Sequence, residues 1–183
     1  MHPAVVEPGR ETTPIVVLFP PRLVPLVDVF RGLGRLSDSY DVTALDALER
    51  RLGAMVGARG AKGVVSDALL LAFGLRRDRI APLSYGPLAS RAGTIDEYRV
   101  LALVAAAYWR DFHLASKAAA ALQLLHAQPL IALALDVARR LERGGIALAL
   151  PDARLLGPAR QVDHRVGVVV SPAEPLPTEH RNR

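Results

Sequence analysis

Cysteine is missing from this sequence altogether, which excludes a disulfide framework, a thiolate nucleophile and every zinc site that needs sulfur ligands. The absence fits a reducing compartment, and we therefore expect a cytoplasmic protein. We expect no secretory signal, because the N-terminal stretch that would form its apolar run contains Pro3, Glu7, Pro8, Arg10 and Glu11.

Lysine is almost missing as well, since Lys62 and Lys117 are the only two. Arginine therefore carries the net charge of +5 and the isoelectric point of about 10.2. A basic chain attracts acidic partners such as nucleic acid. The arginines are scattered, however, and many have an acidic neighbour at helical spacing, which weakens that interpretation.

Long charge-free runs are also scarce, and the one that stands out is 118–135. A membrane-spanning helix needs about 20 mostly apolar residues, whereas this run contains Gln123, His126, Gln128 and Pro129. We therefore do not expect the chain to enter a membrane.

Apolar residues make up 51% of the chain and charged residues only 22%, which excludes a disordered protein. The pattern predicts a mainly α fold, a compact helical bundle of about six helices with a minor two-stranded β-ribbon near the C-terminus. We expect residues 1–20 to be an extended or disordered lead segment, 21–150 a helical domain, and 151–183 a short strand with a mobile Pro-rich tail. The helical domain consists of halves 21–75 and 94–150, joined by a Pro/Gly connector.

In the first half, the β-branched run 15–19 before two prolines predicts a short edge strand or extended arm. A first helix follows and is expected to end at Gly32 and Gly34. A second helix is predicted after Thr43 as N-cap, with one apolar stripe formed by Leu45, Leu48, Leu52 and Met55. Gly57, Gly60 and Gly63 are expected to separate it from a third helix, 64–73, which Gly74 ends.

The strongest local signal lies in the second half, where Thr94 and Glu97 have the spacing of a capping box. The helix that begins there is expected to reach Phe112 and is apolar on most sides, as in a helix that is central in its domain or buried against a second subunit. Helices 114–126 and one starting near Pro129 and ending at Gly144 follow, and the runs 146–150 and 166–170 could pair as the ribbon.

The first candidate site is a cluster at the end of that central helix. Tyr108, Trp109, Arg110 and His113 include residue types that dominate binding hot spots, and helical spacing would place several of them on one face. We identify them as candidate ligand- or partner-binding residues. The alternative is a helix end with core aromatic residues and solvated polar groups.

The second candidate site is basic. Arg59 and Lys62 lie in a glycine-rich segment before a helix, and Arg76, Arg77 and Arg79 follow that helix, so phosphate or nucleic-acid contact is an alternative. The segment lacks the Ser or Thr that a phosphate-binding loop places after its lysine. The would-be recognition helix 64–73 is also almost wholly apolar.

Motifs for catalysis and metal binding are missing. There is no Gly-x-Ser-x-Gly elbow, no His-x-x-x-His and no acidic calcium loop, so we expect no catalytic residue, metal or cofactor. The sequence favours a noncatalytic helical module that binds another protein or a second copy of itself. The alternatives are a basic nucleic-acid-associated regulator, and a small-ligand binder or enzyme centred on Trp109, Arg110 and His113.

Overall fold

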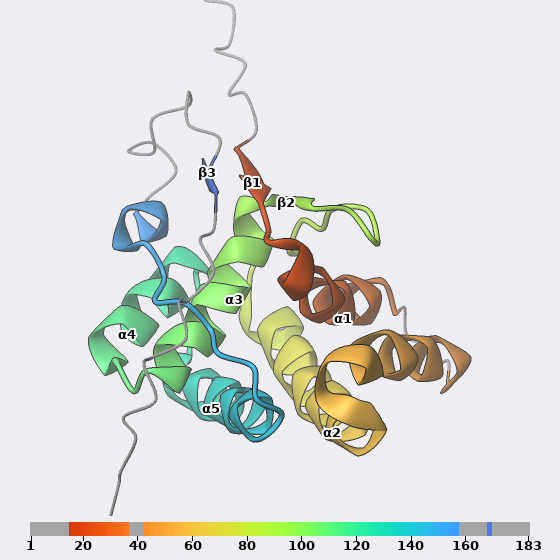
Figure 1. The fold of residues 1–183 in the computed structure, drawn as a ribbon. Coiled ribbons are helices and arrows are strands. Elements are labelled where there is room, and N and C mark those ends of the chain that lie inside the picture. The colour runs from red at the N-terminus through yellow and green to blue at the C-terminus, as the bar shows by residue number, and fades with distance from the viewer. Residues whose placement is uncertain (1–14, 37–41, 158–167, 170–183) are drawn as a thin grey trace, which may run out of the picture.

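The computed structural model describes residues 15–36, 42–157 and 168–169, and this part of the chain is mostly helical (Figure 1). The predicted mainly α fold is confirmed, but the described residues form five α-helices and not about six. The α-helices are α1 Val24–Arg35, α2 Val42–Asp78, α3 Ile95–Tyr108, α4 Phe112–Ala121 and α5 Ala127–Arg143. Two short 3-10 helices are η1 Pro21–Leu23 and η2 Ala153–Leu156.

The lower helix count results from α2, which unites the second and third predicted helices. Its only non-helical residue is Gly57, with φ 73° and ψ 157°, a conformation that is essentially restricted to glycine. The prediction that Gly60 and Gly63 also break the helix is wrong. Residues Ala61 and Val64 beside them are fully buried, and this packing outweighs the weak helix propensity of glycine. Because α2 begins at Val42, Thr43 lies in its first turn and is not the N-cap.

Three glycines that we expected to end helices instead allow close packing. Gly74 lies inside α2, where an added Cβ would collide with the Leu130 side chain of α5. Gly34 lies inside α1, where an added Cβ would collide with the ring of Tyr85. Gly32 likewise leaves room for Leu48. These glycines permit close approach of a neighbouring element and do not act as stop signals.

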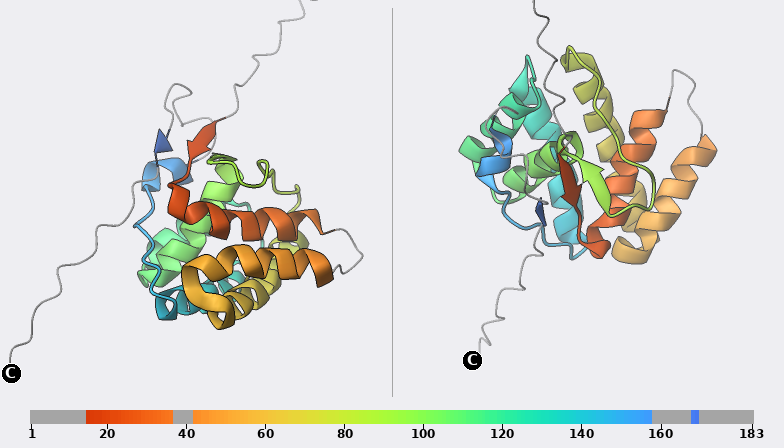
Figure 2. Two further views of the ribbon diagram at one scale, coloured as in Figure 1. Left: turned by 45° about the vertical axis from the view of Figure 1, so that its right-hand side comes forward. Right: turned by 90° about the horizontal axis from the view of Figure 1, so that it is seen from above.

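α3 is the central helix of the molecule. It packs against α4 and α5, while α2 packs against α1 and α5. The kink at Gly57 divides α2 into a first and a second segment, and Figure 2 shows α1 beside the first segment. Every residue from Glu97 to Ala107 is buried. A helix that is apolar on most sides is either central in its own domain or buried against a second subunit. The position of α3 in the centre of its own domain explains the pattern here.

α3 ends earlier than predicted, at Tyr108 and not at Phe112. Arg110 has a positive φ of 55°, which turns the chain, and the Asp111 carboxylate accepts a hydrogen bond from the N–H of Leu114 at 2.9 Å. An aspartate cap of this kind starts a new helix. Phe112, which extended the apolar spacing of α3 across the break, is 66% exposed and does not belong to the core.

The strands are short: β1 Val16–Leu18, β2 Ala92–Thr94 and β3 Val168–Val169. β1 is the middle strand, antiparallel to β2 and parallel to β3, so the prediction of an edge strand is wrong. The predicted ribbon is wrong in its pairing, because residues 146–150 form no strand and β3 pairs with β1. The tail from Ser171 lies outside the described residues.

The last helix matches its prediction closely. α5 has Pro129 in its first turn and ends before Gly144, and its buried face includes Leu130, Val137 and Leu141. Among the helices of the described ranges, none combines the length and hydropathy that crossing a membrane requires.

Candidate functional site

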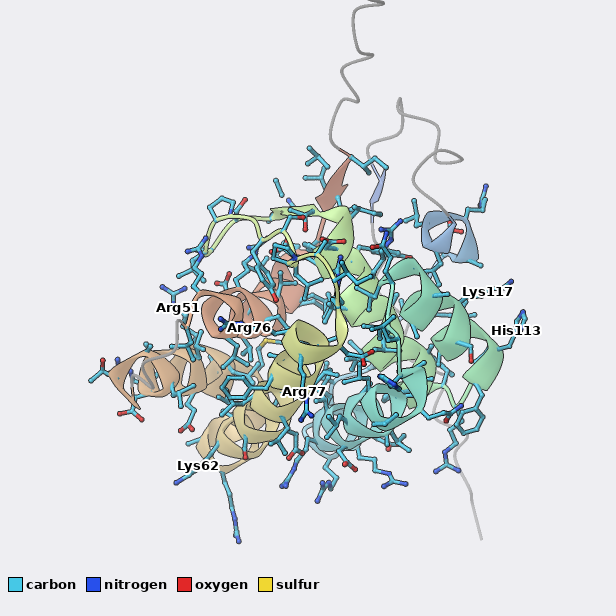
Figure 3. All side chains as sticks on the ribbon, turned by 180° about the vertical axis from the view of Figure 1, so that it is seen from behind. Arg51, Lys62, Arg76, Arg77, His113 and Lys117 are labelled. Atoms are coloured by element: carbon cyan, nitrogen blue, oxygen red, sulfur yellow. The ribbon has the colours of Figure 1, made fainter. Side chains whose placement is uncertain are left out.

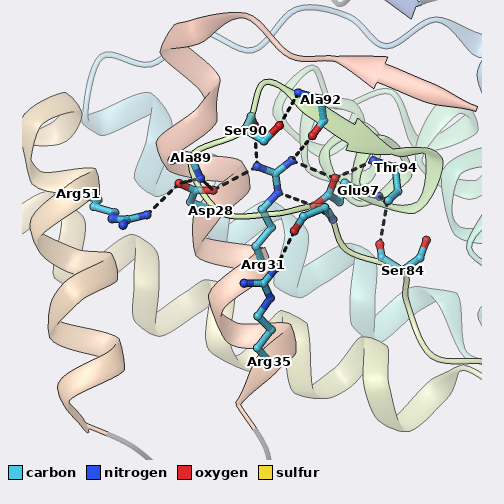
Figure 4. A network of polar contacts seen from close by, with 11 residues as sticks. Asp28, Arg31, Arg35, Arg51, Ser84, Ala89, Ser90, Ala92, Thr94 and Glu97 are labelled. Atoms are coloured by element: carbon cyan, nitrogen blue, oxygen red, sulfur yellow. Dashed lines mark hydrogen bonds and ion pairs between the residues drawn. The ribbon is translucent and has the colours of Figure 1, made fainter.

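A buried arginine fixes the connector 79–91 against two helices (Figure 4). The Arg31 side chain on α1 is fully buried; its Nε donates to Glu97 Oε1 at 2.6 Å and its Nη2 to Glu97 Oε2 at 3.2 Å. The same guanidinium donates to the backbone oxygens of Ser90 and Ala92 at 2.7 and 3.0 Å. Burial by itself lowers the pKa of Arg31, but the hydrogen bonds and charges of Glu97 and Asp28 together outweigh burial and raise it.

Glu97 has a second role in the same place. Its carboxylate accepts from the N–H groups of Thr94 at 2.8 Å and Gly86 at 2.9 Å, and the Thr94 Oγ1 accepts from the N–H of Glu97 at 3.1 Å. The predicted capping box is confirmed. The glutamate that caps α3 is therefore also the buried partner of Arg31, and the cap and the connector are held by one side chain.

Asp28 and Arg35 complete the attachment of the connector. Both Asp28 carboxylate oxygens accept from the N–H of Ala89 at 3.0 Å, and one of them also accepts from Arg51 at 3.2 Å. Arg35 donates to the backbone oxygen of Gly86 at 2.9 Å. Because its polar backbone is held at several points, the connector forms a fixed wall and not a loose loop.

That wall closes one side of a pocket. A cavity of ≈ 360 Å³ lies between the C-terminal end of α1, the C-terminal half of α2 and the connector. Its lining is mainly apolar, with Leu33, Leu36, Leu69, Ala72, Leu75 and Leu83 among its members. Among the described residues, the charged side chains of this lining are Arg35, Arg76 and Arg79, with no carboxylate.

Two aromatic residues frame the pocket. The Tyr85 ring lies directly over Gly34, and burial raises the pKa of its hydroxyl to about 12, so the hydroxyl stays protonated at neutral pH. Phe73 is 50% exposed although it also lines the pocket. An exposed phenyl ring beside a cavity offers apolar contact to a bound molecule.

Arg79 is the unusual member of the lining. Its side chain is only 7% exposed, yet its Nε and Nη1 have no hydrogen-bond partner. The nearest carboxylate oxygen is Asp96 Oδ2, 3.6 Å from Nη1, which is too long for a hydrogen bond. Buried polar groups are nearly always paired in folded proteins, so an unpaired guanidinium requires an explanation.

A second hollow, of ≈ 480 Å³, lies on the first segment of α2. It is lined by Asp46, Glu49, Arg50, Gly53 and Ala58. None of these residues is buried, so the hollow is a surface depression without a buried polar group. We therefore take the pocket beside Arg79 as the candidate functional site.

The structure does not gather the first set of predicted residues into a pocket. Tyr108 and Trp109 stack edge to face at 5.5 Å, and the indole N–H donates to the backbone oxygen of Leu148 at 2.8 Å. Arg110 and His113 are exposed beyond the end of α3, with His113 at the edge of the molecule in Figure 3. We expected these side chains to lie on one helix face, but they do not, because α3 ends at Tyr108 and α4 begins only at Phe112.

The structure also separates the basic residues. Lys62 and Arg76 lie near opposite ends of the second segment of α2 (Figure 3). Arg59 and Arg77 are exposed, whereas Arg76 and Arg79 line the pocket. Because Arg79 is buried, these residues do not form one surface for a phosphate backbone.

Comparison with protein-family models, curated protein sequences and solved structures gives no match for this chain. Within the described ranges, no group of three or more His, Asp or Glu side chains is arranged to hold a metal ion. The site is therefore interpreted from its own geometry and chemistry.

Proposed function

We propose that this chain is a noncatalytic binding protein and that the pocket between α1, α2 and the connector holds a small, partly apolar molecule. The observation that supports this best is the combination of concave shape, apolar lining and fixed wall. A volume of ≈ 360 Å³ falls within the range of about 300–1,000 Å³ that small-molecule sites occupy. Preformed sites of this kind bind without the cost of ordering a loop.

The proposal is for binding without catalysis because the described residues of the lining offer no acid, base or nucleophile that would work near neutral pH. Its titratable side chains are arginines and Tyr85, and the pKa of Tyr85 is raised to about 12. General acid–base catalysis needs a group whose pKa lies near the working pH. These arginines and this tyrosine suit recognition of a ligand better than its conversion.

The test uses a neutral fluorescent probe, N-phenylnaphthylamine, whose emission rises in apolar surroundings. We expect saturable binding to the protein, and an Ala72→Leu variant to bind at least about tenfold more weakly because its larger side chain fills the pocket. Ala132→Leu, an exposed alanine on α5, is the matched control and should bind normally. Equal loss in both variants, or no saturable binding at all, would contradict the proposal.

A second candidate is the self-association that the sequence favoured. α3 is not available for it, but Leu70 and Phe73 on α2 are 54% and 50% exposed, and Ile80 just beyond α2 is 84% exposed. Exposed apolar groups on one element favour burial against a second copy of the chain. Light scattering should then show a dimer that Leu70→Gln disrupts; a monomer at high concentration argues against this candidate.

A further inference from the structure

Two buried arginines share one carboxylate beside the pocket. The side chains of Arg79 and Arg99 are 7% and 10% exposed, and that of Asp96, which approaches both, is 13% exposed. The Nη1 atoms of the arginines lie 3.6 and 3.9 Å from the two Asp96 oxygens. This cluster therefore carries one net positive charge in a place largely shielded from water.

The two arginines lack hydrogen-bond acceptors as well as a second negative charge. The Nε and Nη1 of Arg79 and the Nε of Arg99 have no partner, and Asp96 Oδ2 already accepts from the N–H and Oγ of Ser84 at 3.0 and 3.2 Å. Burial lowers the pKa of Arg99, and the charge of Arg79 adds to that lowering while Asp96 opposes it. The cluster lacks an acceptor with a negative charge.

From this arrangement we propose that the pocket is specific for small molecules with a single carboxylate, which Arg79 binds. The proposal rests on the proposed function, because it names the ligand class of the same pocket. Arg79 lines the pocket. Its Nε and Nη1 are buried, so a ligand in the pocket would reach the guanidinium at its third nitrogen, Nη2. The rest of the ligand lies against Leu33, Leu69 and Ala72, which supply the apolar lining.

A carboxylate fits this cluster better than other groups. One negative charge balances the net positive charge of the cluster of Arg79, Arg99 and Asp96, whereas a phosphate monoester carries nearly two at neutral pH. Arg35 and Arg76 also line the pocket, but they donate to the backbone oxygens of Gly86 and Leu36. The planar guanidinium also matches a carboxylate in shape and in donor spacing. A neutral polar ligand would leave the buried charge unbalanced. The protonated hydroxyl of Tyr85, which also lines the pocket, can donate a further hydrogen bond.

The experiment compares three probes of the same chain length by calorimetry: octanoate, octanamide and octyl phosphate. We expect octanoate to bind at least about tenfold more tightly than either of the others, because only it pairs the guanidinium without excess charge. Equal affinities for octanoate and octanamide would overturn the proposal, and tighter binding of octyl phosphate would replace the carboxylate by a phosphate.

Three variants assign the preference to one residue. Arg79→Gln should bind octanoate and octanamide equally, and Arg79→Lys should keep a weaker preference because it keeps the charge. Arg77→Gln changes an exposed arginine near the end of α2, outside the pocket lining; it is the matched control and should behave like the unchanged protein. A preference that survives Arg79→Gln overturns the proposal, and circular dichroism verifies that each variant is folded.

The two proposals fail in different ways. If N-phenylnaphthylamine binds in the pocket but octanoate has no advantage over octanamide, the ligand class is wrong and the binding function stands. If neither the dye nor any octyl probe binds, the binding function fails and the ligand class fails with it.

Discussion

Replacing Glu97 by glutamine should test the buried network that holds the connector. The two side chains have nearly the same shape, but one carboxylate oxygen becomes an NH₂ group. Each oxygen accepts from Arg31 and from one backbone N–H, that of Gly86 for Oε1 and that of Thr94 for Oε2. Whichever oxygen becomes the NH₂ group, that group then faces one Arg31 N–H and one backbone N–H, both of which are donors. Arg31 keeps only Asp28 as its charged partner.

The magnitude follows from burial. Glu97 and Arg31 have side chains that are 1% and 0% exposed, and removing one partner of a buried ion pair costs about 3–5 kcal/mol. For a chain of this size, 1 kcal/mol shifts the melting temperature by about 2–4 °C. We therefore expect Glu97→Gln to lower the melting temperature by roughly 6–20 °C.

The assay is thermal unfolding followed by circular dichroism, with Asp136→Asn as the matched control. Asp136 pairs with Arg139 at 3.6 Å, but both side chains are more than half exposed, so the control should lose at most about 1 kcal/mol. The double variant Arg31→Met, Glu97→Gln should lose less stability than the sum of the single variants. A melting temperature for Glu97→Gln no lower than that of the control would refute the reasoning.

Three further predictions concern single sites. Gly57→Ala should destabilise the fold by about 1–3 kcal/mol, because an alanine is strained in the backbone conformation of Gly57. Gly53→Ala should stabilise it by about 0.5–1 kcal/mol, because Gly53 lies within a helix and has no close contact. Chemical denaturation measures both; a loss of stability in Gly53→Ala or none in Gly57→Ala would contradict the role of backbone conformation. Arg79→Met should leave the stability unchanged or raise it, because the guanidinium forms no short contact in the folded protein; a large loss in the same assay would make Arg79 structural. The backbone N–H of His126 donates to Asp78 and lowers the pKa of that carboxyl below its ordinary 3.8. The contribution of this hydrogen bond to stability is therefore complete above pH 3.8 and is lost as the pH falls through the lowered pKa. An NMR titration of Asp78 with a midpoint at or above 3.8 would contradict this prediction.

Local signals predicted the helical elements of this fold well. The capping box at Thr94 and Glu97 and the end of α5 at Gly144 are determined by residues within a few positions of each other. Errors arose where a distant contact decided the outcome. Gly34 and Gly74 resemble helix stops in sequence, but each is a glycine because Tyr85 or Leu130 packs against it.

The pocket could not be predicted in the same way. Its connector is held by Arg35 and Gly86, which are 51 residues apart, and by Arg31 and Glu97, which are 66 apart. No spacing rule links such positions. Arg79 attracted attention as one of a run of arginines, yet only the structure separates it from Arg77 by burying it beside the cavity.

The most direct test of the central claim is the NMR signal of the Arg79 Nη2 hydrogens, assigned by comparison with Arg79→Lys. Nε and Nη1 are buried, so Nη2 is the nitrogen that a ligand would meet, and forming a charge-assisted hydrogen bond should shift the resonance of its hydrogens downfield. The account predicts a saturable downfield shift on adding octanoate and none on adding octanamide. An unchanged Arg79 signal at concentrations where octanoate is bound would contradict it.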